Sequence, residues 1–354
     1  MSLSIDRYDV AENTALSRVG YAQNAAFRTK TFEDYGFPTR MTELGQLVRY
    51  IDFFVGAGLN HLQPGNFFRG SSVESNYSED EIGILTRLSE GVREITEKSC
   101  GKRYGVHFNH LSAIGLFRVV QAIASLSGKD RLSIFEVGPG CGYTGTLLGF
   151  QGHGYIAYDV TQGYYIWQSL LYEHFFSGEF TEVAGNEGTD LGALTRIAHL
   201  PWWSFMELYK DNPISADVVI SNANLGEMHV SSLRYVLRVA RQMLIDSDIG
   251  VLIFASVGAC HLNSAETIMD EIGRAGYKSV MSNNVFVFTL EGKDLPAAVV
   301  DTLETQIPLF NPSGTEKTVD AGEFVKFRKG EYPEELDFYA FLSDWPGFDG
   351  RPEG

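Results

Sequence analysis

A short run of residues near the middle of the chain has the composition of a ligand-binding turn. Residues 132–137 are mostly apolar and predict a buried strand, which leads directly into a turn containing Gly138, Gly140 and Gly142. Glycine has no Cβ, so the backbone can turn tightly there and a ligand can approach it closely. Residues 143–150 predict a short helix, whose first N–H groups and positive dipole end would face the same ligand. Nucleotide-type ligands bind at such places in α/β proteins.

Two other residues of this run indicate the charge of the ligand. Glu136 precedes the first glycine by two positions, and Pro139 lies inside the turn. A dinucleotide presents a diphosphate to such a turn, and a carboxylate beside it would repel that group. A ligand with an ammonium group and a sulfonium would be attracted. The Gly-x-Gly-x-x-Gly spacing of dinucleotide binders also occurs, at Gly140, Gly142 and Gly145, so the nicotinamide alternative stays open on this motif alone.

A second carboxylate follows one strand and one helix later. Residues 154–159 predict another apolar strand, which ends on Asp159 with Val160 behind it. Asp159 lies about 20 residues beyond the first glycine, where doubly wound proteins place a carboxylate against ribose hydroxyls. Nicotinamide enzymes and methyltransferases share this feature. The alternative is that Asp159 only caps the helix that follows it.

Acid-base candidates follow a later strand. Residues 216–224, which include Asn222 and Asn224, predict a strand that leads to a polar turn over 226–229, and that turn contains Glu227 and His229. A His or Glu within hydrogen-bond reach of a hydroxyl suits general-base catalysis near neutral pH. The alternative for His229 is a helix-start residue bonded to the backbone.

Two other clusters contain residues that could contact a substrate. His107 and His110 form a His-x-x-His spacing, which is weak evidence for a metal without a third ligand nearby, so we expect no metal site. They could line the mouth of the site, and packed or surface histidines are the alternative. His199 precedes Trp202 and Trp203, which could stack on a ring of the ligand or substrate. A structural aromatic cluster is the alternative, and it is favoured for Trp203 more than for Trp202, because adjacent large aromatic side chains are rarely both buried.

The order of elements predicts the fold class. From residue 129 to 292 the pattern alternates strands and helices, with a long loop predicted over 185–210. It ends in a predicted hairpin formed by 277–281 and 285–290. We therefore predict an α/β fold, a Rossmann-like doubly wound sheet with a terminal antiparallel hairpin.

These motifs together resemble the class I S-adenosylmethionine-dependent methyltransferases. The resemblance covers Leu132 to Leu290 and includes the Glu-x-Gly-x-Gly-x-Gly turn, the Asp-Val-Val-Ile strand and the Leu-Pro-Trp-Trp run. The family's sheet ends in an antiparallel strand, whereas a nicotinamide domain would normally end in another parallel unit. The resemblance implies a cofactor, S-adenosyl-L-methionine. It implies cofactor contacts at nine positions: Glu136, Gly138, Pro139, Gly140, Gly142, Asp159, Val160, Asn222 and Asn224.

A narrower resemblance concerns the substrate. Tyr158-Asp-Val-Thr-Gln and Tyr164-Tyr-Ile-Trp-Gln resemble sugar O-methyltransferases of bacterial surface-polysaccharide and natural-product gene clusters. This implies methyl transfer to a sugar or sugar-like hydroxyl with His229 as base, and Glu227 or His110 as the fallback. His107, Trp202 and Trp203 would then contact the substrate. An NAD(P)-dependent oxidoreductase and a methyltransferase for a peptide or nitrogen nucleophile are the alternatives.

The two ends of the chain predict additional elements. Residues 1–128 are mainly helical, with a helix over 42–55 and a capping box from Ser78 to Glu81. This region either covers the substrate or serves packing or dimerisation. Residues 293–354 form a C-terminal extension whose aromatic residues predict that it packs on the body.

Composition narrows the range of partners. The chain has 354 residues, 44% of them hydrophobic, and a formal net charge of −17. Such a charge argues against nucleic acid and against an anionic membrane surface. Three cysteines without paired spacing, and the lack of a signal-like segment or apolar span, predict a cytoplasmic protein with reduced thiols. A small-molecule substrate is expected, and a homodimer is possible.

Overall fold

The sheet of this protein is built around β1, the strand that precedes the glycine turn. A computed structural model describes residues 3–17, 41–45, 78–103, 109–186, 188–222, 224–228, 230–254, 263–282 and 285–305. In it the strands lie in the order β3-β4-β2-β1-β5-β6-β8-β7. The strands are β1 (Ser133–Val137), β2 (Gly154–Asp159), β3 (Phe180–Glu182), β4 (Ile197–Pro201), β5 (Val218–Ile220), β6 (Val251–Phe254), β7 (Tyr277–Ser282) and β8 (Phe286–Leu290).

The strand directions confirm the predicted fold class. Strands β1 to β6 pair in parallel, whereas β8 is antiparallel to β6 and to β7. After β1 the chain adds strands first on one side of β1 and then on the other. The protein is therefore a doubly wound α/β fold that closes with an antiparallel hairpin, as the sequence predicts.

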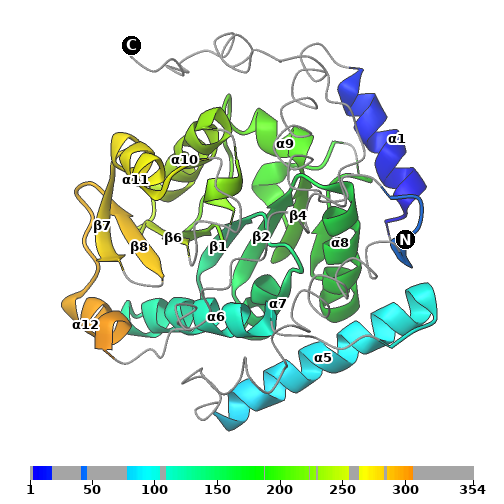
Figure 1. Ribbon diagram of the computed structural model, residues 1–354, viewed down its shortest axis with the longest axis horizontal. Coiled ribbons are helices and arrows are strands. Elements are labelled where there is room, and N and C mark those ends of the chain that lie inside the picture. The colour runs from blue at the N-terminus through cyan, green and yellow to red at the C-terminus, as the bar shows by residue number, and fades with distance from the viewer. Residues whose placement is uncertain are drawn as a thin grey trace.

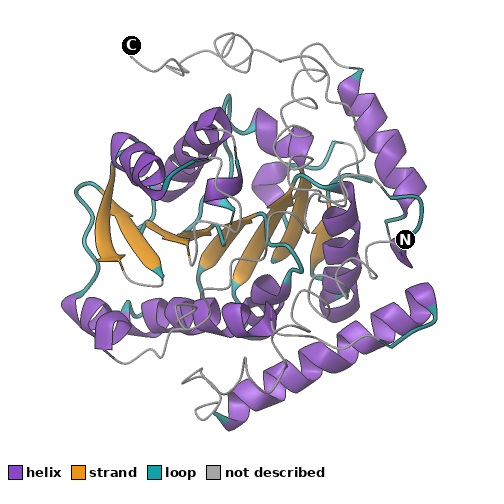
Figure 2. Ribbon diagram, viewed as in Figure 1, coloured by secondary structure: helices purple, strands orange, loops and turns teal. Residues whose placement is uncertain are grey.

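Helices cover both faces of this sheet (Figures 1 and 2). Helices α9, α10 and α11 lie on one face, and α6, α7 and α8 lie on the other. The helices are α1 (Ile5–Leu16), α5 (Glu79–Cys100), α6 (Asn109–Leu126), α7 (Tyr143–Phe150), α8 (Gln162–Phe176), α9 (Trp202–Glu207), α10 (Val230–Leu244), α11 (Ala265–Arg274) and α12 (Ala297–Thr305). None of these described helices has both the length and the apolar character of a membrane span.

Side-chain alternation along the strands divides the core into two layers. In β1, Phe135 and Val137 pack toward α9 and α10, whereas Ile134 packs toward α6 and α7. Alternate residues of a strand point to opposite faces. The same rule places Glu136 on the face of α7 and α8, where it contacts Tyr155.

The segment predicted as a long loop, residues 185–210, contains a strand and a helix. Residues Ile197–Pro201 form β4, which is buried along its whole length between β2 and β3. Helix α9 follows it directly. The loop prediction is wrong because the segment contains His199 and Pro201, which are uncommon in a buried strand, and because a fully buried strand shows no alternation.

The N-terminal helices differ in what they cover. The predicted capping box is confirmed at α5, where Ser78 and Glu81 exchange side-chain-to-backbone hydrogen bonds of 2.9 and 3.1 Å. Helices α5 and α6 pack against α7, and the core layer they join continues across residue 128 into the sheet. They therefore thicken one face of the sheet. The predicted helix over 42–55 lies mainly outside the described residues, as does the extension after residue 305.

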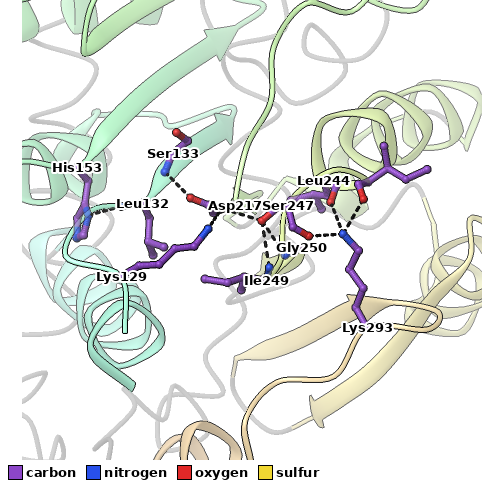
Figure 3. A network of polar contacts seen from close by, with 11 residues as sticks. Lys129, Leu132, Ser133, His153, Asp217, Leu244, Ser247, Ile249, Gly250 and Lys293 are labelled. Atoms are coloured by element: carbon purple, nitrogen blue, oxygen red, sulfur yellow. Dashed lines mark hydrogen bonds and ion pairs between the residues drawn. The ribbon is translucent and has the colours of Figure 1, made fainter. Parts of the chain in front are cut away.

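Hydrogen bonds close the amino-terminal edge of the sheet (Figure 3). Asp217, just before β5, accepts from Lys129 Nζ at 2.7 Å, from the backbone N–H of Ser133 at 3.0 Å and from Ser247 Oγ at 2.7 Å. Lys293 Nζ donates to the carbonyls of Leu244 and Ile245 at 3.1 and 2.6 Å and to that of Ser247. The charged side chains of Asp217, Lys129 and Lys293 at this edge therefore have hydrogen-bond partners within the protein.

Candidate functional site

The carboxyl ends of β1, β2 and β5 meet at the point where the strand order reverses. Strand β1 pairs with β2 on one side and with β5 on the other, and Glu136 is level with both Ala157 and Ile220. In open α/β sheets, ligands bind outside the carboxyl ends of the strands at such a switch point. The predicted cofactor residues follow these strands.

The turn after β1 has the backbone that its glycines predict. Gly138, Gly140 and Gly142 have φ angles of 63°, 57° and 73°, in the left-handed region that residues with a Cβ rarely adopt. A Cβ at Gly138 would lie 2.3 Å from Asn224 Nδ2, whereas a Cβ at Gly140 would meet no atom of the described residues within 4 Å. Gly140 and Pro139 are half-buried. The turn therefore leaves open space over Gly140, directly ahead of the first turn of α7.

Asn224 holds this turn in place. Its Nδ2 donates to the carbonyls of Val137 at 2.5 Å and Gly138 at 3.3 Å, and its Oδ1 accepts from Ser221 Oγ. The amide is buried. In the structure the Asn224 amide shapes the glycine turn, and its predicted contact with the cofactor stays a prediction. Asn222 is half-buried beside it.

Gly145 allows a helix and a strand to pack closely. A Cβ there would lie 2.0 Å from the ring of Tyr155, so this glycine lets α7 approach β2. The third glycine of dinucleotide-binding turns has the same packing role. The packing of Gly145 therefore does not discriminate between a dinucleotide and another nucleotide-type ligand.

Glu136 is a buried carboxylate whose hydrogen-bond partner is a tyrosine. Tyr155 Oη donates to its Oε2 at 2.6 Å, and Tyr172 Oη lies 3.2 Å from Tyr155 Oη. Burial raises the pKa of Glu136 to about 7, an effect that the Tyr155 hydrogen bond opposes and the charge of Asp159 increases. Among the described residues, no Lys or Arg acts on this pKa.

Asp159 is the second buried carboxylate at this edge. Its Oδ1 accepts from the backbone N–H of Thr161 at 3.0 Å and from Thr161 Oγ1 at 3.1 Å. Thr161 is the N-cap residue of α8, so Asp159 does brace the start of that helix, as the alternative interpretation expects. Burial raises the pKa of Asp159 to about 6, although these hydrogen bonds and one from Gln168 lower it. Val160, which follows it, is buried.

Gln168 joins the two halves of the site and was missed by the sequence analysis. Its Nε2 donates to the carbonyl of Gly140 at 2.6 Å and to Asp159 Oδ2 at 2.9 Å. In the sequence Gln168 is the last residue of the Tyr164-Tyr-Ile-Trp-Gln run, and that resemblance alone gives it no role in the site.

The aromatic run after β4 is buried. Trp202 and Trp203 are 1% and 7% exposed, so both belong to a structural aromatic cluster, against the expectation that such a pair is rarely buried together. Trp202 Nε1 donates to Glu12 Oε1 of α1 at 2.6 Å, and Trp203 packs on Tyr8 with ring centroids 5.3 Å apart. The polar end of Trp202 has a buried partner, which removes the reason to expect it at the surface. In this structure neither indole has a free face for a substrate.

His199 is also a core residue. It is fully buried, stacks on Tyr165 at 3.8 Å and lies 2.9 Å from Ser169 Oγ through its Nδ1. Burial holds the pKa of His199 well below its ordinary value, so it stays neutral. Its predicted stacking on a ligand ring is therefore wrong.

Helix α1 borders the site at the ends of β2, β4 and β3. Besides the Glu12 contact to Trp202, Arg7 Nη2 donates to the carbonyl of Gly185 at 2.5 Å. Gln162 Nε2 donates to Asp9, and Gln162 Oε1 accepts from the backbone N–H of Met41 at 2.7 Å. Helix α1 therefore packs at the carboxyl ends of these strands, and a covering role for the N-terminal region stays a prediction.

The predicted acid-base residues lie largely outside the described part of the chain. His229 and His107 are outside it, and nothing is described of the side chains of Glu227 and His110. Their roles stay predictions. Within the described ranges, no three His, Cys, Asp or Glu side chains gather as metal ligands would.

Comparison with known proteins finds similar solved structures. A methyltransferase from Podospora anserina, solved with S-adenosylhomocysteine (SAH), is 9% identical, and the match covers 67% of this chain and 96% of that chain with a TM-score of 0.36. Magnesium protoporphyrin IX methyltransferase from Synechocystis PCC 6803, also solved with SAH, is 12% identical over 60% of this chain and 100% of that chain, with a TM-score of 0.35. A ribosomal protein L11 methylase from Lactobacillus delbrueckii subsp. bulgaricus is 14% identical over 50% and 77% of the two chains, with a TM-score of 0.31.

No family model matches the sequence, and a search of curated proteins finds no match either. The similarity to solved structures is too low to assign a function. The functional argument therefore rests on this chain's own site.

Proposed function

We propose that this protein is an S-adenosylmethionine-dependent methyltransferase. The observation that carries the proposal is the pairing of an open glycine turn with two buried carboxylates at the switch point of the sheet. Gly140 leaves space beside the backbone, and Glu136 and Asp159 lie behind and beside that turn without a cation among the described residues.

A ligand with positive charge and ribose hydroxyls fits this arrangement. Buried carboxylates are stabilised when a cation or hydrogen-bond donor reaches them. An ammonium group and a sulfonium supply positive charge, and ribose hydroxyls supply donors for Asp159. A diphosphate would bring further negative charge toward Glu136 and Asp159. The site therefore fits S-adenosylmethionine better than a nicotinamide dinucleotide.

The residues of this chain would have distinct roles in that site. The turn of Gly138, Gly140 and Gly142 would hold the methionine end near Glu136, and Asp159 would hold the ribose. When bound, S-adenosylmethionine supplies an activated methyl group on a good leaving group. The protein's task is then to hold a nucleophile in line with that methyl, which can contribute on the order of 7–11 kcal/mol.

The proton of a hydroxyl nucleophile needs an acceptor. We assign this role to His229, with Glu227 or His110 as the fallback, because the turn that follows β5 in sequence is where the family resemblance places the reacting groups. A sugar or sugar-like hydroxyl is the substrate class we propose, on the resemblance of the segments around Asp159 and Tyr164. A peptide or a nitrogen nucleophile is the alternative.

Calorimetry with SAH and with NADH tests the cofactor. We expect SAH to bind and NADH not to bind at the same concentration. Binding of NADH alone would establish the oxidoreductase alternative, and binding of neither would leave a protein that kept the fold without this cofactor. A screen of sugar acceptors with labelled S-adenosylmethionine then tests the substrate class.

A further inference from the structure

Gln168 connects two segments of the site, the glycine turn after β1 and the end of β2. It lies on α8 and is fully buried. One of its atoms, Nε2, donates both to the Gly140 carbonyl at 2.6 Å and to Asp159 Oδ2 at 2.9 Å. An amide nitrogen has two hydrogens, so each acceptor receives one. The glycine turn after β1 and the end of β2 are thereby held at a set separation.

This hydrogen bond completes the orientation of the Asp159 carboxylate. Thr161 occupies Oδ1 through its backbone N–H and its hydroxyl, and Gln168 occupies Oδ2. With both oxygens restrained, the carboxylate plane cannot rotate freely. A group that must receive ligand hydroxyls benefits from such pre-organisation, because less freedom is lost on binding.

The donor to Asp159 Oδ2 is a neutral amide and not a charged side chain. An amide orients a carboxylate and leaves its charge uncompensated, whereas a lysine would form an ion pair, as Lys129 does with Asp217. Gln168 Oε1 is buried and has no hydrogen-bond partner among the described residues. Such an unsatisfied atom costs stability. A residue retained only for packing would not need to carry that cost.

We propose that Gln168 is a positioning residue, which holds the Asp159 carboxylate and the Gly140 backbone in the arrangement that receives the ligand. The identity of that ligand, S-adenosylmethionine, rests on the function proposed above. Gln168 itself is not assigned a contact with the reacting atoms. Its effect on binding passes through Asp159 and Gly140.

Two substitutions, Gln168→Glu and Gln168→Met, test this role by calorimetry with SAH across pH 5.5–8. In Gln168→Glu, the introduced carboxylate repels Asp159, so we expect SAH affinity at pH 8 to fall at least about tenfold. As pH decreases, the two carboxyls come to share a proton, and a hydrogen bond between them can form again. SAH affinity of this variant should therefore rise toward low pH, whereas that of the wild-type protein should fall as its own site carboxylates gain protons.

Gln168→Met keeps the approximate volume of the side chain and removes both hydrogen bonds. We expect SAH affinity about tenfold weaker, with the pH trend of the wild-type protein. Ser169→Ala is the matched control, because Ser169 lies next to Gln168 on α8, is buried and faces His199. It should change stability at most and leave SAH affinity unchanged. Wild-type affinity and pH trend in both Gln168 variants would overturn the proposal.

A measurement without ligand separates this inference from the proposed function. The carboxyl carbon of Asp159 can be titrated by NMR in the ligand-free protein and assigned by its loss in Asp159→Asn. Gln168→Met should raise the pKa of Asp159, because a hydrogen bond to the charged form is lost, and Ser169→Ala should not. An unchanged Asp159 titration in a folded Gln168→Met protein would refute the positioning role. Failure of wild-type protein to bind SAH would refute only the cofactor assignment.

Discussion

Buried carboxylates at the amino-terminal and the carboxyl ends of the parallel strands, here called the two edges of the sheet, have pKa values shifted in opposite directions. At the amino-terminal edge, Asp217 has Lys129, the Ser133 backbone and Ser247 as donors, and although burial acts to raise its pKa, these groups lower it below the ordinary value (Figure 3). At the carboxyl edge, burial raises the pKa values of Glu136 and Asp159 to about 7 and 6, and no described Lys or Arg offsets it.

This difference distinguishes an edge that stabilises the fold from the edge where we propose that the ligand binds. A carboxylate with a lowered pKa stabilises the fold at neutral pH, and that stabilisation is lost as pH falls through the folded-state pKa. A carboxylate with a raised pKa contributes stability below its unfolded-state pKa, and loses it as pH rises through its folded-state pKa. At neutral pH the carboxyl edge therefore costs stability that a suitable ligand can recover.

The largest expected effect is on the rate of methyl transfer, with SAH affinity nearly unchanged. His229→Ala should lower kcat by about 10²–10⁴-fold, because the proton acceptor is lost, while SAH affinity stays nearly unchanged. Methyl transfer from labelled S-adenosylmethionine and SAH calorimetry measure the two quantities. EDTA should not affect the wild-type rate. A fully active His229→Ala enzyme would remove His229 as base, and activity lost to EDTA and restored by magnesium would show that a metal takes part.

The next largest effect concerns the open space over the glycine turn. Gly140→Val places a branched side chain there and should weaken SAH binding by about 100-fold or more, since a positive φ strains a branched residue and the space is filled. Gly128→Val is the control: Gly128 has a φ of 69°, also faces open space and precedes Lys129 at the other edge. It should bear a similar strain and keep full SAH affinity. Equal losses in both variants would mean that strain alone explains the result.

Replacing Asp217, the carboxylate that pairs with Lys129, should lower stability and leave SAH affinity unchanged. Asp217→Ala leaves Lys129 and the Ser133 N–H without their acceptor and should lower the free energy of unfolding by about 1.5–3 kcal/mol. SAH affinity per folded molecule should not change. Urea unfolding and calorimetry measure the two effects, and a large loss of SAH affinity would show that the two edges are not independent.

Neutralising a site carboxylate should raise stability. Glu136→Gln keeps an oxygen that can accept from Tyr155 and removes a buried charge that no described Lys or Arg offsets, so unfolding at pH 8 should cost on the order of 1–2 kcal/mol more. The gain should vanish near pH 4, where the carboxyl is protonated in both states. SAH affinity should fall at the same time. A destabilised Glu136→Gln protein at pH 8 would contradict the contrast between the edges.

The smallest effect is the pH dependence of the wild-type protein. SAH affinity should rise by about tenfold between pH 5.5 and 7.5, as Glu136 and Asp159 lose protons through pKa values of about 7 and 6. Calorimetry over this range measures the trend, and Glu136→Gln should flatten its upper part. Affinity that is constant over this range would mean that neither carboxylate binds SAH in its charged form.

The sequence predicts those parts of the fold that depend on residues close together in the chain. The turn at Gly138, Gly140 and Gly142 and the capping box at Ser78 depend on residues close together in the chain, and both are confirmed. The hairpin of β7 and β8 is confirmed for the same reason. Strand β4 was not predicted because His199 and Pro201 are uncommon in buried strands. Its burial depends on pairing with β2 and β3, which are separate from it in the sequence.

The amino-acid sequence by itself determined the glycine turn and the positions of Glu136 and Asp159 at strand ends, because backbone conformation and strand alternation depend on near neighbours. Tertiary structure alone decided that Asn224 braces the turn and that Trp202 is buried against Glu12. It also decided that Gln168 joins Gly140 to Asp159. These contacts join segments that are separate in the sequence, and a hydrogen bond between them depends on packing, which no spacing of residues encodes.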